Sequence, residues 1–270
     1  MAAFINTNTA SLNSQRNLSS SQTSLTNSLQ RLSSGLRVNS AKDDAAGLSI
    51  ATKMDTQVRG MSQAIRNAND GISLAQTADG ALSTATEAMQ RMRELAVQAA
   101  NGTNASEDST NLTKEFDALA SEVTRLATDT KFNGKQILAT SGTAVTIQVG
   151  ADSGDAIAIG KTDLQGIAST LTGLDLSTAS VSLKALDTAL ASVTGLRADL
   201  GATQNRLSYS ISNLQSSVEN QSAAKSRIMD TDFAAETASM TRGQILQQAG
   251  TAMLAQANSL PNGVLSLLRG

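Results

Sequence analysis

Apolar residues recur at helical spacing along most of the chain. The clearest tract lies between Met54 and Met89, where apolar positions alternate steps of four and three until Asp79 interrupts them. Such spacing is typical of the a and d positions of coiled coils. The tract consists of Met54, Val58, Met61, Ile65, Ala68, Ile72, Ala75, Leu82 and Met89. It predicts one helix from about Ala45 to Ala100.

Further tracts with the same spacing predict four more helices. They cover residues 18–36, 112–126, 183–228 and 245–260. Gly35 interrupts the first tract, and we expect the last helix to stop at Pro261, because proline breaks helix interiors. Phe132-Asn133-Gly134-Lys135 predicts a turn after the third helix.

The middle of the chain, about residues 136–179, has a different pattern. Val145–Val149 and Ala156–Ile159 are short runs rich in β-branched residues, and the intervening Gly150–Asp155 is rich in Gly and Asp. This arrangement predicts two strands joined by a turn. We therefore expect a small β and loop region between two helical halves.

Helix length constrains the shape of the molecule. A helix from Ala45 to Ala100 would be about 80 Å long, whereas a compact globule of this chain length would be about 50 Å across. The sequence therefore predicts a mostly α fold, a rod-shaped bundle in which long helices of the N- and C-terminal halves pair, with a small β-hairpin region in the middle.

Composition excludes several classes of function. The chain has no Cys, no His and one Pro, and its aromatic content is 2%. Disulfides, Cys or His metal ligands and the usual nucleophile–base pairs are therefore excluded, whereas chemistry by carboxylates alone is still allowed. We expect no cofactor and no enzyme. The net charge of −2 with no basic face argues against nucleic-acid binding. No apolar run is long enough for membrane insertion, and the chain start lacks the pattern of a cleaved signal peptide.

The two terminal tracts allow two interpretations. They could form an ordinary intramolecular coiled coil. Alternatively, because each is one amphipathic helix of weak intrinsic propensity, they could become ordered only when other copies cover them. In the second case the polymerisation interface would include Leu25, Leu29, Leu32, Leu36, Ile245, Leu246, Met253, Leu254 and Leu260.

Several long segments resemble bacterial flagellin. They are Ile5–Asn8, Leu32–Leu48 (LSSGLRVNSAKDDAAGL), Asn67–Thr77 (NANDGISLAQT), Phe132–Gly134 and Ile245–Asn258 (ILQQAGTAMLAQAN). The resemblance covers roughly residues 1–140 and 185–270. Gly243 stands where the family usually has Ala, and Asn262-Gly263 follow Pro261 where Gln is common. Because glycine weakens helix interiors, we expect the last helix to be slightly weakened.

The resemblance implies an architecture and a function. Residues 1–44 and 229–270 would form the inner tube of a filament, and residues 45–228 its middle shell, with the β region 136–179 outward and no large outer domains. The chain would self-polymerise into the extracellular flagellar filament for motility, after export without a cleaved signal peptide. Implied partners are the flagellar cap, hook-junction proteins, an export chaperone and the export apparatus.

Three alternatives compete with the filament subunit. A hook–filament junction protein shares the terminal helices of the family. An enzyme carried on a flagellin scaffold would need a zinc-protease motif with two histidines, and the chain has none. A soluble coiled-coil adaptor would remain a monomer or a small oligomer.

A further match concerns host recognition. Gln90–Val97 (QRMRELAV) resembles the segment that Toll-like receptor 5 recognises in stimulatory flagellins. The resemblance implies receptor contacts at Arg91, Leu95 and Glu115, on a surface that the family also uses for packing between subunits.

Three other motifs receive structural interpretations. Gly154–Thr162 resembles a phosphate loop but has five residues between its glycines instead of four. Asp43 and Asp44 are expected to favour the start of the following helix through its dipole. The glycosylation patterns at Asn17, Asn101 and Asn104 are expected by chance in a chain rich in Asn, Ser and Thr.

Overall fold

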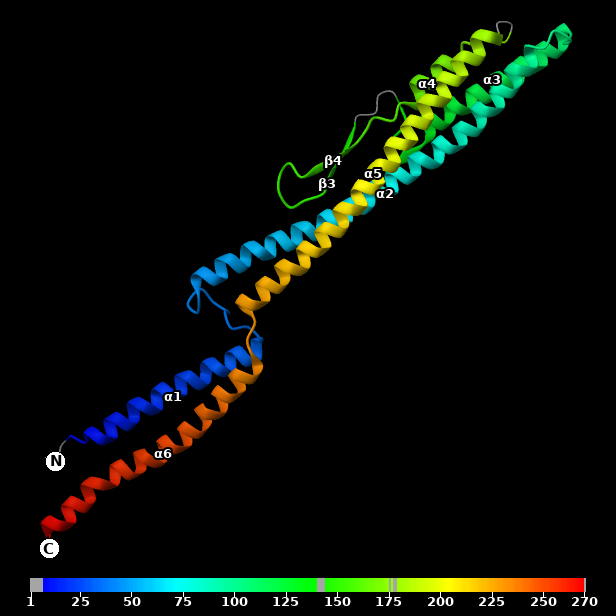
Figure 1. The fold of residues 1–270 in the computed structure, drawn as a ribbon. Helices are drawn as coiled ribbons and strands as arrows, with labels where there is room; N and C mark the ends of the chain where they lie inside the picture. The colour runs from blue at the N-terminus through cyan, green and yellow to red at the C-terminus, as the bar shows by residue number, and fades with distance from the viewer. Residues whose placement is uncertain (1–6, 140–143, 175, 177–178, 270) are drawn as a thin grey trace. The chain divides into compact units, whose positions relative to one another are not determined.

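The chain forms six helices and two small hairpins within the part that the structure describes (Figure 1). The computed structural model describes residues 7–139, 144–174, 176 and 179–269, but not the side chains of 179–181 and 260–269. In chain order the elements are α1 (Thr9–Ser34), α2 (Ala45–Ala99), α3 (Ser106–Asp129), β1 (Lys131–Phe132), β2 (Lys135–Gln136), β3 (Val145–Gln148), β4 (Ala156–Ile159), α4 (Leu164–Leu171), α5 (Ala179–Met229) and α6 (Phe233–Arg269). The mostly α fold and the long helix predicted from Ala45 are confirmed.

The chain is divided into two compact units. Unit 1 contains Met1–Thr56 and Asn220–Gly270, and unit 2 contains Gln57–Glu219. Both divisions fall inside long helices, α2 and α5. This division of a single chain does not test the predicted boundaries at residues 44 and 228, which concern layers of an assembled filament, and those boundaries stay a prediction.

The buried stripe of α2 in unit 2 differs in phase from the predicted seam. Met61, Ala68, Ala75, Leu82 and Met89 are buried as predicted. The second column is not the predicted one, because Val58, Ile65 and Ile72 are only half-buried. Its buried members are instead Ala64, Gly71, Ala78, Ala85 and Met92.

The same shift of phase occurs on α5. Leu186, Val193, Leu200, Leu207 and Leu214 are buried, but the second buried column consists largely of small or polar residues, Ser182, Ala189 and Thr203. The predicted Leu183, Leu190, Ile211 and Val218 are half-buried beside it. Small side chains allow helix backbones to approach closely, so they occupy the centre of an interface while larger residues flank it. A search for large apolar residues therefore selects the flanks.

Charged residues at the flanks of the seam connect the two helices. Asp79, which interrupts the predicted seam, accepts a hydrogen bond from Arg197 Nε at 2.7 Å. Arg93 Nε donates to Asp187 at 2.7 Å farther along the same pair. Because all four side chains are at least one-third exposed, these pairs add more to the choice of register than to stability.

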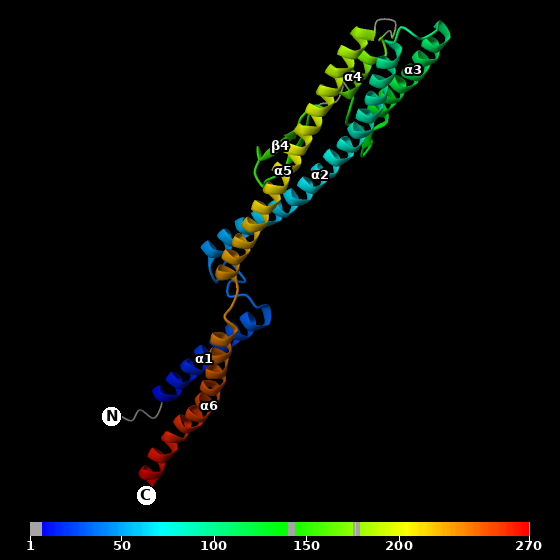
Figure 2. The ribbon, with the colours of Figure 1, turned by 45° about the vertical axis from the view of Figure 1, so that its right-hand side comes forward.

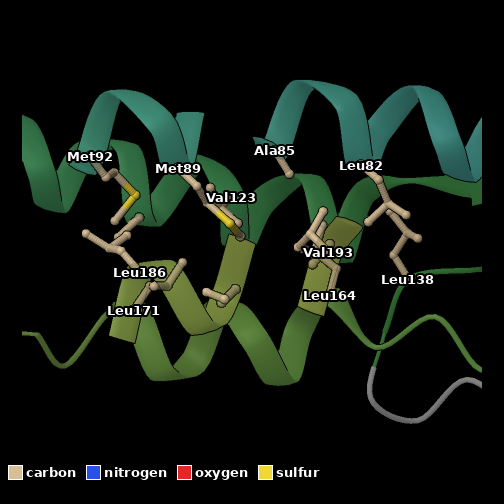
Figure 3. Packing of buried hydrophobic residues seen from close by; sticks show 14 of the residues in the cluster. Leu82, Ala85, Met89, Met92, Val123, Leu138, Leu164, Leu171, Leu186 and Val193 are labelled. Atoms are coloured by element: carbon tan, nitrogen blue, oxygen red, sulfur yellow. The ribbon is translucent and has the colours of Figure 1, made fainter. Parts of the chain in front are cut away.

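The core of unit 2 is completed by α3 and α4 (Figure 3). Leu82, Met89 and Met92 of α2 face Val123 of α3 and Leu164 and Leu171 of α4. Helix α4 corrects the expectation that residues 136–179 contain only β and loop structure. Its N-cap Asp163 accepts a hydrogen bond from Gly166 N at 2.7 Å, and the buried Leu164, Ala168 and Leu171 lie on one helical face.

Both predicted turns form hairpins. Phe132 pairs with Lys135 around Asn133 (φ 49°) and Gly134 (φ 78°), and two consecutive positive φ values are typical of the tight type I′ hairpin turn. The strands β3 and β4 pair antiparallel with the predicted limits, apart from Val149. The β3 strand packs on α2, where a Cβ added to Gly71 would lie 3.0 Å from Ile147 Cγ1.

The prediction that the last helix stops at Pro261 is wrong. Helix α6 continues to Arg269. The φ angle of proline is compatible with a helix, but proline crowds the carbonyl four residues earlier and removes the N–H that would donate to it. That carbonyl belongs to Ala257, and Asn8 Nδ2 donates to it at 2.8 Å. A side chain of another segment therefore replaces the missing bond.

Candidate assembly surface

In unit 1, α1 packs along α6, as both ribbon views show (Figures 1 and 2). Glycines of α6 allow the close approach. A Cβ on Gly243 would lie 3.3 Å from Leu25 Cβ, and one on Gly250 would lie 3.1 Å from Leu18 Cδ1. Gly243 therefore has a packing role that the expectation of a weakened helix did not include. Because small residues form the contact, the pair buries little large apolar surface.

The predicted interface residues divide into two groups. Leu29, Ile245, Leu246 and Met253 are 47%, 60%, 50% and 62% exposed. Leu25, Leu32, Leu36 and Leu254 are half-buried, and they therefore remain partly accessible in a single chain. Leu260 lies in α6, but its side chain is outside the described part, as are Ile5 and Asn6 of the opening motif.

Two further large residues belong to the exposed apolar set. Leu12 of α1 is 51% exposed, and Phe233 at the start of α6 is 56% exposed. Sequence reasoning missed both because they lie outside the seams, although Phe233 is one of only four phenylalanines. We call Leu12, Leu29, Phe233, Ile245, Leu246 and Met253 the terminal apolar surface.

A shallow groove of about 830 Å³ follows the first turns of α6. Its lining combines part of the terminal apolar surface with small residues and one cation, namely Phe233, Ala234, Thr237, Ala238, Thr241, Arg242, Ile245 and Leu246. Exposed apolar residues gathered along one helix are typical of a surface that another protein covers.

The segment that follows α1 and the segment that precedes α6 are hydrogen-bonded to each other in unit 1. Arg37 N donates to Met229 O at 2.6 Å, and Thr231 N donates to Gly35 O at 3.0 Å. The Arg37 guanidinium also donates to Ile228 O at 2.7 Å. The last carbonyls of a helix have no partner within it and carry the negative end of its dipole. Arg37 therefore caps α5 and holds the end of α1 beside the start of α6.

The paired aspartates before α2 have different contacts: Asp44 acts at the start of α2, as expected, whereas Asp43 binds the preceding turn. Asp44 Oδ1 accepts a hydrogen bond from Gly47 N at 2.8 Å, and it therefore acts as a cap at the start of α2. Asp43 Oδ2 accepts from the Ser40 hydroxyl at 3.0 Å and from the backbone N–H groups of Ser40 and Asn39. These donors, the Ser40 hydroxyl first, lower the pKa of Asp43 below its ordinary value.

The residues expected to contact a receptor do not all lie on the surface. Arg91 and Glu115 are exposed and paired, with Nε to Oε1 at 3.0 Å, and Arg91 Nη1 also donates to Glu94 at 2.9 Å. Glu94 and then Glu115 raise the pKa of Arg91. Leu95 is only 1% exposed and belongs to the core of unit 2. A receptor would reach the Leu95 side chain only by opening the core, and the expected contact at Leu95 stays a prediction.

The loop that resembles a phosphate site has another structure. Ala156–Ile159 form β4, and the next helix begins only at Leu164. Lys161 lies 3.6 Å from the Asp163 carboxylate. Among the described residues, no cluster of three acidic side chains could hold a metal, and none of the described helices is long and apolar enough to cross a membrane.

Comparison with known proteins agrees with the arrangement of long terminal helices around a short middle. A flagellin of Halalkalibacterium halodurans is 46% identical over 271 residues, covering 98% of this chain and 100% of that protein. A flagellin of Xenorhabdus nematophila is 43% identical over 313 residues and is covered completely. The crystal structure of Bacillus cereus flagellin matches with a TM-score of 0.51 and 36% identity, over 59% of this chain and 94% of that chain.

Family models match both halves of the chain. The bacterial flagellin N-terminal helical region matches residues 5–143, and the bacterial flagellin C-terminal helical region matches residues 183–268. Together they contain α1, α2 and α3 and nearly all of α5 and α6, but not α4. The chain therefore belongs to the bacterial flagellin family.

Proposed function

We propose that copies of this chain polymerise into a flagellar filament through the terminal apolar surface of α1 and α6. In that filament, residues 1–44 and 229–270 form the inner tube and residues 45–228 the middle shell. The observation that carries the proposal is the exposure of large apolar side chains on both terminal helices, with Ile245 and Met253 at 60% and 62%.

A second copy is the occupant that best fits this surface. A pair of helices in contact through Gly243 and Gly250 buries little apolar area and is only marginally stable alone in water. Each large apolar side chain that another copy covers contributes roughly 1.5–3 kcal/mol. Association therefore stabilises the terminal helices themselves, and folding of these helices is coupled to assembly.

Seeded assembly tests this proposal. Short filament fragments are added to the purified full chain, and the pellet is measured and examined by electron microscopy. The parent is expected to form long filaments, whereas Ile245→Asp and Met253→Asp are expected to remain soluble, because a buried unpaired charge is costly. Ile245→Leu and Met253→Leu are matched controls that conserve the apolar volume, and both should assemble. If the aspartate variants assemble as well as the parent, the terminal apolar surface is not part of the interface.

Family membership supports a proposal on the remaining partners and the location. We infer extracellular location after export without a cleaved signal peptide, and contacts with the flagellar cap, hook-junction proteins, an export chaperone and the export apparatus. The alternative of a hook–filament junction protein has no support from the described residues. It would gain support if the full chain stayed soluble with filament seeds.

A role in recognition by Toll-like receptor 5 is a second proposal, and it rests on Arg91 and Glu115. These two exposed side chains support the proposal because they form an ion pair between neighbouring helices, with 2.9 Å between Arg91 Nη2 and Glu115 Oε1. Receptor activation by the soluble chain should fall for Arg91→Ala and for Glu115→Ala. Unchanged activation by both variants would contradict the proposal.

A further inference from the structure

The proline in α6 leaves one backbone carbonyl without its helical donor. In a regular α-helix the N–H of residue 261 would donate to the carbonyl of residue 257, and proline has no N–H. Helix α6 nevertheless continues through this position. Ala257 is 4% exposed, so water has little access to its surroundings. A buried carbonyl without a partner is costly, and a donor from elsewhere is required.

Asn8 supplies that donor and also caps the helix to which it leads. Its Nδ2 donates to Ala257 O at 2.8 Å, and its Oδ1 accepts from Ser11 N at 3.0 Å, which makes it the N-cap of α1. Only one orientation of the amide places the donor on the carbonyl and the acceptor on the N–H. One side chain therefore satisfies an end of α1 and the interruption in α6.

A neighbouring polar contact follows the same register. Ser11 Oγ donates to Asn258 Oδ1 at 2.7 Å, and Ser11 is 7% exposed. A slip of α1 by one residue would move these atoms by about 1.5 Å along the helix axis. Hydrogen bonds lose most of their strength over such a displacement. Glycine-lined contacts along the rest of the pair lack this directionality.

We propose that Asn8 is the positioning residue that sets the register of α1 on α6, by replacing the backbone donor that Pro261 removes. The inference rests on the proposed assembly function, because this register determines where Leu12 and Leu29 lie relative to Ile245 and Met253. Pro261 then fixes the position of the contact, because it leaves an acceptor at one point of α6 to which Asn8 donates.

The first variant removes the donor and keeps the cap. In Asn8→Asp the remaining carboxylate oxygen still caps α1, since Asp is a favoured N-cap, but no N–H faces Ala257 O. Seeded assembly of the full chain gives the critical concentration, and hydrogen exchange with mass spectrometry gives the protection of peptides from α1. We expect the critical concentration to rise about tenfold and α1 to exchange faster. Asn13→Asp, the same change at an exposed position of α1, is the matched control and should behave like the parent.

The second variant tests the connection to the proline. Pro261→Ala restores the N–H of residue 261, so the Ala257 carbonyl regains a donor within α6. Added to Asn8→Asp, it should return both the critical concentration and the α1 exchange to within about twofold of the parent. The inference is overturned if Asn8→Asp matches the parent in both measurements, or if Pro261→Ala fails to rescue it.

The two proposals fail in different ways. If the parent assembles and Asn8→Asp assembles equally well, the register role fails and the filament function stands. If the parent itself stays soluble with seeds, the assembly function fails, and exchange in the soluble chain decides the contact between Asn8 and Ala257: equal α1 exchange in parent and Asn8→Asp overturns it.

Discussion

Replacing Leu95 with alanine should destabilise unit 2 strongly, although the sequence had placed Leu95 among surface contacts. Its side chain is 1% exposed and lies in the main hydrophobic cluster. A Leu→Ala change in a packed core costs about 3 kcal/mol, because it removes the transfer free energy of the deleted atoms and leaves a cavity. For a unit of this size, each kcal/mol lowers Tm by roughly 2–4 °C. The expected decrease in Tm is therefore about 6–12 °C.

Thermal unfolding followed by circular dichroism at 222 nm measures this decrease on the soluble full chain. Val97→Ala is the matched control, because Val97 lies on the same helix and is 51% exposed; its Tm should change little. Arg91→Ala, which removes only an exposed ion pair, should also leave Tm nearly unchanged. The reasoning is refuted if Leu95→Ala lowers Tm no more than Val97→Ala does.

This result also decides how receptor experiments are interpreted. A loss of receptor activation in a variant that combines Arg91→Ala and Leu95→Ala has two causes, a lost surface contact and a destabilised core. Arg91→Ala alone separates them, because it keeps the core intact. Lost activation by Leu95→Ala at a temperature where unit 2 has unfolded therefore says nothing about contact with the receptor.

Three further predictions follow from the geometry. Gly80→Ala should raise the stability of α2 by about 0.5–1 kcal/mol, because nothing lies within 4 Å of its added Cβ. Gly71→Ala should instead lower stability by about 1 kcal/mol through overpacking. Urea unfolding measures both variants, and equal effects would contradict the close packing around Gly71. The folded protein lowers the pKa of Asp43, so the stabilising effect of its carboxylate is fully present above the ordinary pKa of 3.8 and is lost as pH falls through the pKa in the folded protein. In a carbon NMR titration, Ser40→Ala should raise the pKa of Asp43, and an unchanged pKa would argue against the contact with the Ser40 hydroxyl. Arg37→Ala should speed hydrogen exchange at the start of α6, and Arg37→Lys should have an intermediate effect, because lysine lacks the planar donor fork of arginine. Identical exchange in the parent and both variants would contradict the capping role of Arg37 at Ile228 O.

Much of the secondary structure could be predicted from local patterns. The limits of β4, the start of α2 at Ala45 and the turn at Asn133-Gly134 were all confirmed. These features depend on spacing, capping and backbone preference within a few residues, and such information is local. Helix α4 was missed although Asp163 and the spacing of Leu164, Ala168 and Leu171 carry the same kind of signal.

The candidate surface was only partly predictable. Periodicity identified Leu29, Ile245, Leu246 and Met253, which are exposed, together with Leu25 and Leu32, which are half-buried. A seam shows which residues share a face of a helix. It does not show whether the same chain covers that face, since this depends on how closely α1 and α6 approach.

The sequence by itself determined the family, the existence of the five long helices, the hairpins and the lack of Cys and His chemistry, because each depends on residue identity or on spacing along one segment. Tertiary structure alone decided the phase of the buried stripe, the burial of Leu95 and the continuation of α6 through Pro261. Each of these depends on atoms from a distant segment: small residues lie in the centre where two backbones approach, and the Asn8 amide reaches the carbonyl that proline leaves open. Local preference sets what each segment can form, and packing between segments selects which face and which register are used.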